Sequence, residues 1–334
     1  MVCVAGVALV GACDRASAAH APPPTRPSVR APLVAGDSAT WIEMRNVHLR
    51  LGDRGAIRIR RLRGEMIRAV PSVPAALDDE RSFSIRITDG SVSLTGEDLA
   101  ALLNGYVFAY RGAPLKKLAV RFEGDRIIQS GVMHKGVDLP FEITASLALT
   151  AEGLVRLHPE RVRILGVDGA ALLGALRLRL DDLLDLSGAR GASVKGNDIY
   201  LDPAKSIPPP AIVGRLASVR IEGEELVQQF VRLADDSVFG GYVRPDTSVT
   251  SFIYFRGGQM RFGKLTMWDT DLQIDDADQS DPFDLYLAKY NEQLVAGFSR
   301  NHSDLGLDVQ MPDYSDIRRP PVPPVVSGAR PPRR

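Results

Sequence analysis

Alternation of apolar and polar residues is the feature that most constrains how this chain folds, and it is clearest in residues 118–167. Turn sequences such as Gly124-Asp125-Arg126 and Ala151-Glu152-Gly153 separate the alternating segments. A period of two, with a turn after about eight to twelve residues, is typical of an antiparallel meander with one buried and one solvated face. The sequence therefore predicts consecutive antiparallel strands in this region.

Further strand signals lie on both sides of this meander. Residues 44–51 and 56–63 predict a hairpin joined through a glycine-rich turn. Residues 224–236 fit either a helix or a strand. Additional strands are expected near residues 193–201, 214–222, 250–256, 259–275 and 292–299.

Three segments have helical features. Thr95 and Asp98 resemble a capping box, followed by an apolar stripe of Leu99, Leu102 and Leu103. Residues 169–187 place leucines at helical spacing, and a short helix is expected to begin at Pro282 with Asp281 as its N-cap.

Many strands, few helices and no alternation of strand with helix predict the α+β class. We expect a β-meander and helix unit over residues 41–167. A second half, rich in helix and strand, is expected to pack on it over residues 168–316.

The N-terminus predicts a secreted and lipidated protein. Residues 2–12 are apolar or small, and a helix of that length reaches only about 16 Å, too short for a hydrocarbon core of about 30 Å. The run has the length of a signal-peptide apolar region, and Leu9–Cys13 resembles a bacterial lipobox. We expect a signal peptide over residues 1–21, with Cys13 as the lipid anchor; the alternative is ordinary cleavage after Ala18 or Ala21. The expected location is the bacterial cell envelope, on the periplasmic side, with the membrane as a partner through lipidated Cys13.

Proline-rich segments flank the expected folded part. Residues 22–40 have no apolar period and predict an extended tether. Residues 318–334 combine arginine and proline without an acidic residue, which predicts a disordered basic tail.

Composition excludes several classes of function. The 41 basic residues balance 41 acidic ones, without the basic excess of a typical nucleic-acid binder. Cys3 and Cys13 are the only cysteines, so the rest of the chain has no disulfide, thiolate metal site or cysteine nucleophile. Hydrolase motifs are absent and the five histidines are scattered, so we expect no catalytic residue, no cofactor and no enzyme.

Two motifs resemble ligand sites without completing them. Residues 258–264 have the glycine spacing of a P-loop, but Leu265 stands where Ser or Thr would bind Mg²⁺, and the neighbours predict strands. Asp276, Asp278 and Asp281 resemble part of a calcium loop, but the loop's Gly and final Glu are missing. We interpret these acids as a solvated turn and helix cap, and leave them as weak metal candidates.

Several segments together resemble a known group of envelope proteins. They are Thr95–Leu103, Gly153–Leu157, Val162–Gly166, Gly188–Asp198, Leu201-Asp202-Pro203 and Pro208-Pro209-Pro210. In this combination, residues 85–230 resemble the LmeA-like bacterial envelope proteins and, more distantly, lipoproteins with tubular lipid-binding (TULIP-like) domains. The resemblance implies a strongly curved antiparallel β-meander wrapped around amphipathic helices, with an apolar groove for lipid between them. The groove candidates are Leu99, Leu102, Leu103, Val107, Phe108, Leu118, Val120, Phe122, Phe141, Ile143, Leu147, Leu149, Leu173 and Leu176.

Two functions stay open at this point. The first is a non-enzymatic envelope lipoprotein that binds a lipid or other apolar molecule in the groove. The second is an envelope scaffold whose core is fully packed and whose surface binds another envelope protein, since the same apolar stripes suit a solid core.

The lipobox predicts a specific mature N-terminus. In a host that processes bacterial lipoproteins, we expect the mature chain to begin at Cys13 with attached acyl chains, because two or more chains anchor a protein stably. Intact-mass spectrometry measures this, and Cys13→Ser should move the protein from the membrane fraction to the soluble fraction. An unmodified chain beginning after Ala18 or Ala21 would contradict the prediction.

Overall fold

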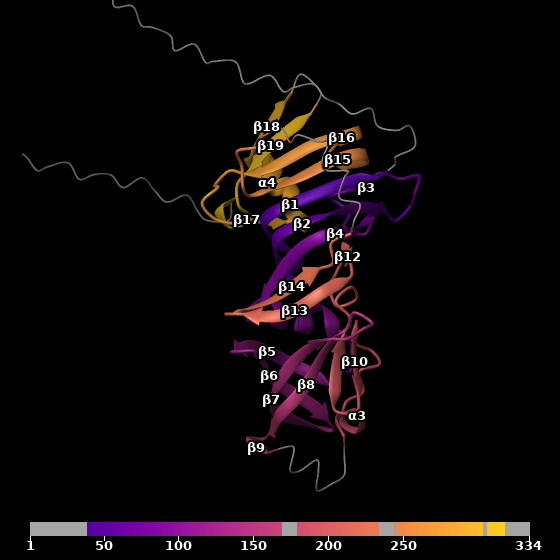
Figure 1. Ribbon diagram of the computed structural model, residues 1–334, viewed down its shortest axis with the longest axis vertical. Coiled ribbons are helices and arrows are strands. Elements are labelled where there is room, and N and C mark those ends of the chain that lie inside the picture. Colours follow the sequence, from indigo (N-terminus) through magenta and orange to yellow (C-terminus); the bar gives the residue numbers. More distant parts are fainter. Residues whose placement is uncertain (1–38, 169–178, 234–243, 245, 303–305, 318–334) are drawn as a thin grey trace, which may run out of the picture.

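The computed structural model describes residues 39–168, 179–233, 244, 246–302 and 306–317. Strands make up 55% of these residues and helices 13%, so the chain is mostly β and the expected α+β class is wrong. Figure 1 shows a larger sheet and a smaller, curled sheet that follow one another along the long axis of the molecule.

The larger sheet has twelve strands, with a main path in the order β13, β14, β4, β2, β1, β15, β16, β19 and β18. It is mixed, because four of its strand pairs are parallel: β1 with β17, β4 with β12, β15 with β3, and β16 with β19. The bounds are β1 Thr40–Arg50, β2 Ala56–Arg68, β3 Ala75–Ala76, β4 Phe83–Thr95, β12 Ala211–Val213, β13 Leu216–Glu222, β14 Glu225–Phe230, β15 Phe252–Phe262, β16 Leu265–Asp276, β17 Phe283–Tyr286, β18 Phe298–Asn301 and β19 Leu307–Met311.

The smaller sheet is an antiparallel half-barrel of seven strands in the order β10, β11, β8, β7, β6 and β5, with β9 paired to β8. Its strands are β5 Leu115–Glu123, β6 Arg126–Lys135, β7 Val137–Leu149, β8 Val155–Ile164, β9 Val167–Asp168, β10 Ala192–Lys195 and β11 Asp198–Leu201. The strands expected within residues 118–167 are thus confirmed. The expected boundary between residues 167 and 168 falls within β9, and the whole smaller sheet lies in sequence between β4 and β12.

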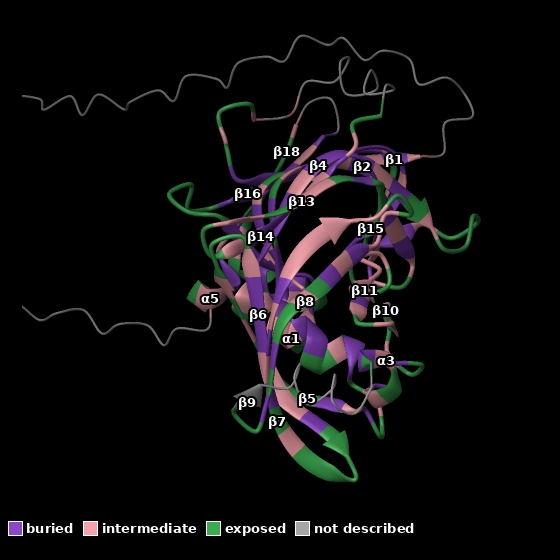
Figure 2. Ribbon diagram, turned by 60° about the horizontal axis from the view of Figure 1, so that its bottom comes forward, coloured by how far each residue is buried: buried purple, intermediate pink, exposed green. Residues whose placement is uncertain are grey.

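Burial differs between the sheets (Figure 2). In β5, β7 and β8 buried side chains alternate with more exposed ones along much of each strand, as the sequence pattern indicates, whereas β6 buries Ile127, Ile128 and Gln129 in succession. In β15 the consecutive residues Phe252, Ile253, Tyr254 and Phe255 are all buried, so both faces of the larger sheet are covered there. Polar side chains of the neighbouring strand β16 are therefore buried as well.

Helix α1 (Gly96–Leu102) lies where the two sheets meet and contacts both β4 and β5. The expected capping box is present: Asp98 N donates to Thr95 Oγ1 at 3.1 Å, and Thr95 N donates to Asp98 Oδ2 at 3.2 Å. A Cβ atom on Gly96 would lie 2.3 Å from the carbonyl oxygen of Val120, so only glycine permits this close approach of helix and strand. A π-helical turn, Leu103–Val107, continues α1.

Several expected elements differ in the structure. Of the helix expected over residues 169–187, residues 169–178 lie outside the described part, α3 (Leu180–Leu183) is a single turn, and residues 184–187 are not helical. The helix expected from Pro282 is instead strand β17, because parallel pairing with β1 buries Phe283 and Leu285. Helix α4 (Tyr290–Ala296), preceded by the 3₁₀ turn Leu287–Lys289, replaces most of the strand expected at residues 292–299.

The remaining short elements are the 3₁₀ turn Gly52–Arg54 and helix α5 (Tyr314–Ile317). Of residues 224–236, which fit either a helix or a strand, residues 225–230 form β14, whereas residues 234–236 lie outside the described part. Residues 258–264 belong to β15 and its hairpin turn. The strands expected there are confirmed, and these residues do not form the loop and helix of a P-loop. None of the helices in the described part of the chain is both long and apolar enough to cross a bilayer.

Asn104 ties the helical segment to the smaller sheet. Its side-chain amide donates to the carbonyl oxygens of Ala100 and Leu118 at 2.8 and 2.7 Å, and its Oδ1 accepts from Leu118 N at 2.9 Å. Leu118 lies at the irregularity in β5 where pairing with β6 is interrupted between Lys116 and Ala119. The side chain of Asn104 thus satisfies both backbone groups of a residue that the sheet leaves unpaired.

Asn104→Ala should destabilise the fold, because it leaves two partly buried backbone groups of Leu118 without this partner. We expect a loss of about 2 kcal/mol in the free energy of unfolding, measured by urea titration. Asn291→Ala, on the exposed side of α4, is the matched control and should change stability little. Equal effects of the two substitutions would contradict the assigned role.

Candidate functional site

Among the described residues, side chains fill most of the space inside the half-barrel, where a groove was expected. Its cavity measures about 20 Å³, little more than one water molecule occupies, and is lined by residues such as Phe141, Ile143 and Leu180. Leu173 and Leu176 lie outside the described residues. Among the other groove candidates, Leu99, Leu102, Leu103, Val107, Phe108, Leu118, Phe141 and Ile143 are buried, and Val120, Phe122, Leu147 and Leu149 are partly buried against the same core.

A much larger apolar opening, here called the intersheet groove, lies between the larger sheet and the loops of the smaller one. Its volume is about 440 Å³. One wall comes from β4, β12, β13 and β14, and the other from the β7–β8 turn at residues 152–154 and the segment 202–207 that follows β11. None of the described groove candidates lines it. Its principal apolar residues are Ile87, Val92, Leu94, Leu154, Pro203, Ile207, Ile212, Val213, Leu216, Phe230 and Leu233.

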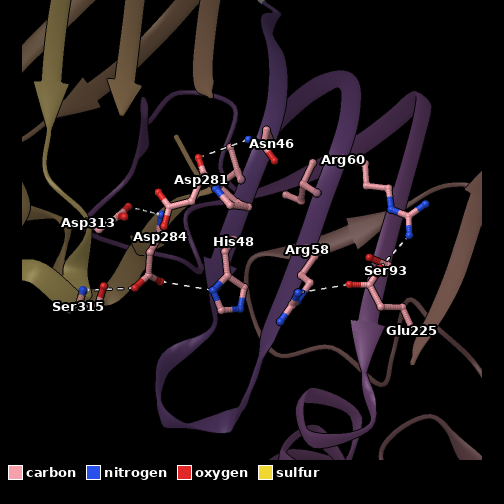
Figure 3. Close-up of a pocket in the computed structure, with 13 residues that line it drawn as sticks. Asn46, His48, Arg58, Arg60, Ser93, Glu225, Asp281, Asp284, Asp313 and Ser315 are labelled. Atoms are coloured by element: carbon pink, nitrogen blue, oxygen red, sulfur yellow. Dashed lines mark hydrogen bonds and ion pairs between the residues drawn. The ribbon is translucent and has the colours of Figure 1, made fainter. Parts of the chain in front are cut away.

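A second opening, the polar cleft, has a volume of about 410 Å³ (Figure 3). Residues 46–48 of β1 and 58–60 of β2 form its floor, and Ser93 and Glu225 lie at one end. The segments after β16 and β19 supply the other end, with Asp281, Asp284, Asp313 and Ser315. Sequence reasoning missed the cleft, because strands distant along the chain build it.

The basic side chains of the polar cleft are paired with carboxylates. Arg58 and Arg60 reach Glu225 at 3.3 and 2.7 Å. Arg50 binds both carboxylate oxygens of Asp284 at 2.5 and 2.6 Å, and His48 lies 3.5 Å from the same carboxylate. Burial opposes the ionisation of Asp284, but the hydrogen bonds from His48 and Arg50 outweigh it and hold the pKa of this carboxyl well below its usual range. Asp284 is therefore the ionised partner of these two groups.

Three other carboxylates gather beside the cleft, and no ion pair joins them to a basic side chain among the described residues. An oxygen from each of Asp276, Asp281 and Asp313 lies within 4.8 Å of one from each of the others. Burial, with repulsion from neighbouring acids, raises the pKa of Asp276 to about 7 and that of Asp313 to about 6. Of the weak metal candidates, Asp276 and Asp281 belong to this group, whereas the side chain of Asp278 is turned to Ser280 N at 3.0 Å. Asp313 was not among the candidates, because nothing in its local sequence marks it.

Comparison with known protein families gives no match for this chain, and neither curated proteins nor solved structures give one.

Two buried acids of β16 differ in how their charge is compensated. Asp271 pairs with the buried Arg256 at 3.2 Å and accepts a hydrogen bond from Tyr254. Asp275 accepts from Gln273 at 2.6 Å, but burial and the nearby Asp308 raise the pKa of the Asp275 carboxyl to about 8. Asp275 thus holds its proton more tightly in the folded chain than in the unfolded one.

The raised pKa of Asp275 predicts a pH dependence of stability. The protonated carboxyl of Asp275 adds to the free energy of unfolding. This contribution is full below about pH 4 and is lost as the pH rises toward 8, because the carboxyl ionises at a lower pH in the unfolded chain than in the folded one. Asp275→Asn should therefore have a higher Tm than the wild type at pH 8, with a smaller difference at pH 5, in thermal unfolding in metal-free buffer. Asp271→Asn is the contrasting control and should lower the Tm at both pH values, since it removes charge that compensates buried Arg256. A difference in Tm between Asp275→Asn and the wild type that does not increase with pH would contradict the prediction.

Proposed function

We propose that this protein is a non-enzymatic envelope lipoprotein that binds one acyl chain of a lipid in the intersheet groove. The observation that carries the proposal is the volume of the groove, about 440 Å³, against about 20 Å³ inside the half-barrel. Pockets for small molecules commonly measure about 300–1,000 Å³ and are lined mostly by apolar side chains. The intersheet groove meets both conditions.

The walls of the groove favour recognition by apolar burial. Ile87 and Val92 of β4 lie on one side, and Leu154 and Ile207 from the smaller sheet's loops lie on the other. Val213 and Leu233 are 46% and 42% exposed, so apolar surface is available without any rearrangement. A bound chain would gain about 25 cal/mol for each Å² of apolar surface removed from water.

Charge at the groove favours a neutral or zwitterionic lipid. The lining includes two basic residues, Arg86 and Arg215, and two acidic ones, Glu152 and Asp202. Arg86 also pairs with Glu65, and Asp202 with Lys205 at 2.9 Å. Because the two basic and two acidic residues of the lining balance one another, an anionic head group would gain no net electrostatic attraction there.

The proposed location follows from the sequence. A lipidated Cys13 would hold the folded part near a membrane, on the periplasmic side of a bacterial envelope, through the tether of residues 22–40. The groove would then be within reach of the bilayer that supplies its ligand.

Filling the groove should abolish lipid binding. Ala204 lies in its wall and is partly exposed, so Ala204→Trp places a large side chain in the space of the ligand. We expect the full chain with Cys13→Ser as background, purified from the soluble fraction without detergent, to carry lipid detectable by mass spectrometry and to bind a fluorescent acyl probe. Ala204→Trp should weaken probe binding at least tenfold, or about 1.4 kcal/mol.

Ala217→Trp adds the same side chain at an exposed position of β13 outside the groove, and should bind the probe like the Cys13→Ser background. Equal binding by Ala204→Trp and Ala217→Trp would exclude the groove as the site. If the Cys13→Ser background carries no lipid and takes up no probe, the packed envelope scaffold becomes the better explanation.

A further inference from the structure

We propose that Asp276, Asp281 and Asp313, here called the acidic site, bind a calcium ion at the edge of the polar cleft. This site is separate from the intersheet groove and does not depend on the proposed lipid binding.

Three different segments supply the acidic site. Asp276 is the last residue of β16, Asp281 lies in the loop between β16 and β17, and Asp313 follows β19. Parallel pairing places Asp276 opposite Met311, so the ends of β16 and β19 lie side by side. The loop after β16 then returns to β1, where the carbonyl oxygen of Asp281 accepts hydrogen bonds from Asn46 and Ser251 at 3.4 and 3.1 Å. The backbone thus brings the three residues that carry these carboxylates together.

An enclosed carboxylate oxygen of Asp276 points to a ligand. Asp276 is only 2% exposed, and its Oδ1 accepts from Asp278 N at 3.0 Å. Its Oδ2 is buried and has no hydrogen-bond partner among the residues that the structure describes. A buried acceptor left unsatisfied costs about 1–3 kcal/mol, and more when it is charged. A cation shared with Asp281 and Asp313 would supply the missing interaction.

The surroundings of the acidic site are consistent with a cation of high charge. Asp313 is also buried, at 5% exposure, and its Oδ1 accepts from Asp284 N at 2.6 Å. The basic side chains nearby lie on other carboxylates: Arg50 binds Asp284, with His48 3.5 Å from the same carboxylate, and Arg58 and Arg60 bind Glu225. Figure 3 shows His48 beside Asp284, and Arg58 and Arg60 beside Glu225, in the same cleft that Asp281 and Asp313 line.

The donor set favours calcium among the common metal ions. All three side chains offer carboxylate oxygens, which hard cations prefer, while zinc prefers sites with nitrogen or sulfur ligands. Calcium takes about six to eight oxygen ligands in flexible geometry and accepts waters among them, which a site open to a cleft provides. Magnesium requires a near-ideal octahedron and loses water reluctantly. We therefore expect calcium to bind more tightly than magnesium.

Calorimetric titration of the chelator-treated full chain with CaCl₂ tests the proposal. We expect one site per chain, with a Kd of about 10⁻⁵–10⁻³ M and weaker binding of MgCl₂. Calcium at 10 mM should raise the Tm by about 3 °C or more, because it binds only the folded state. Asp276→Asn should remove both the binding heat and the shift in Tm while still folding in chelator, since the amide oxygen can keep the hydrogen bond from Asp278 N.

Asp278→Asn is the matched control. It removes the same charge two residues away, from a carboxylate that is turned to Ser280, and should retain calcium binding within about twofold of the wild type. A wild type that gives no binding heat and no shift in Tm at 10 mM calcium overturns the proposal. Equal losses in Asp276→Asn and Asp278→Asn would overturn the assigned ligands and indicate a general attraction of acidic residues for calcium.

Discussion

Backbone pairing between β1 and β15 is the interaction on which the rest of the structure depends. β1 opens the described part of the chain and β15 follows the whole smaller sheet, yet they align antiparallel from Trp41 opposite Arg256 to Arg45 opposite Phe252. β1 also pairs with β2 and, in parallel, with β17. One strand therefore joins the β1–β2 hairpin, the β15–β16 hairpin and β17. The long loop that this pairing closes costs entropy, which burial of residues such as Ile42 and Phe255 offsets.

This arrangement creates two openings of different chemistry. The polar cleft forms where β1 and β2 meet the ends of β16 and β19, and its lining is rich in charged side chains. The intersheet groove forms where β12 to β14 face the loops of the half-barrel, and its lining is mostly apolar. In the part of the chain that the structure describes, the half-barrel encloses only about 20 Å³. The candidate ligand sites therefore lie where separate segments of the chain meet, and not inside the half-barrel.

Compensation of buried charge distinguishes structural acids from candidate ligands. Asp271 has Arg256, and Asp284 has Arg50 and His48, so both are explained by ion pairs that support the fold. Asp276 has an enclosed oxygen with no hydrogen-bond partner in the described part of the chain, and two more carboxylates lie beside it. Like charges gathered out of water destabilise a fold unless protons or a cation neutralise them. The proposal of a cation at the acidic site rests on this contrast and not on the number of acidic residues.

The sequence by itself determined the local structure of the smaller sheet and of α1. Alternation predicted the strands between residues 118 and 167, and Thr95 with Asp98 predicted the cap, because period and capping depend on nearby residues alone. Strand β4 also alternates, at Phe83, Ile85 and Ile87, but the pattern shifts phase near Asp89 and was missed. Asp276 and Asp281 were recognised as weak candidates, whereas Asp313 and the intersheet groove were not. Only the tertiary structure decided that Pro282 begins no helix, that the expected groove residues fill a core, and that the openings lie between sheets. Each of these depends on which distant strands pair, and short-range periodicity carries no information about that choice.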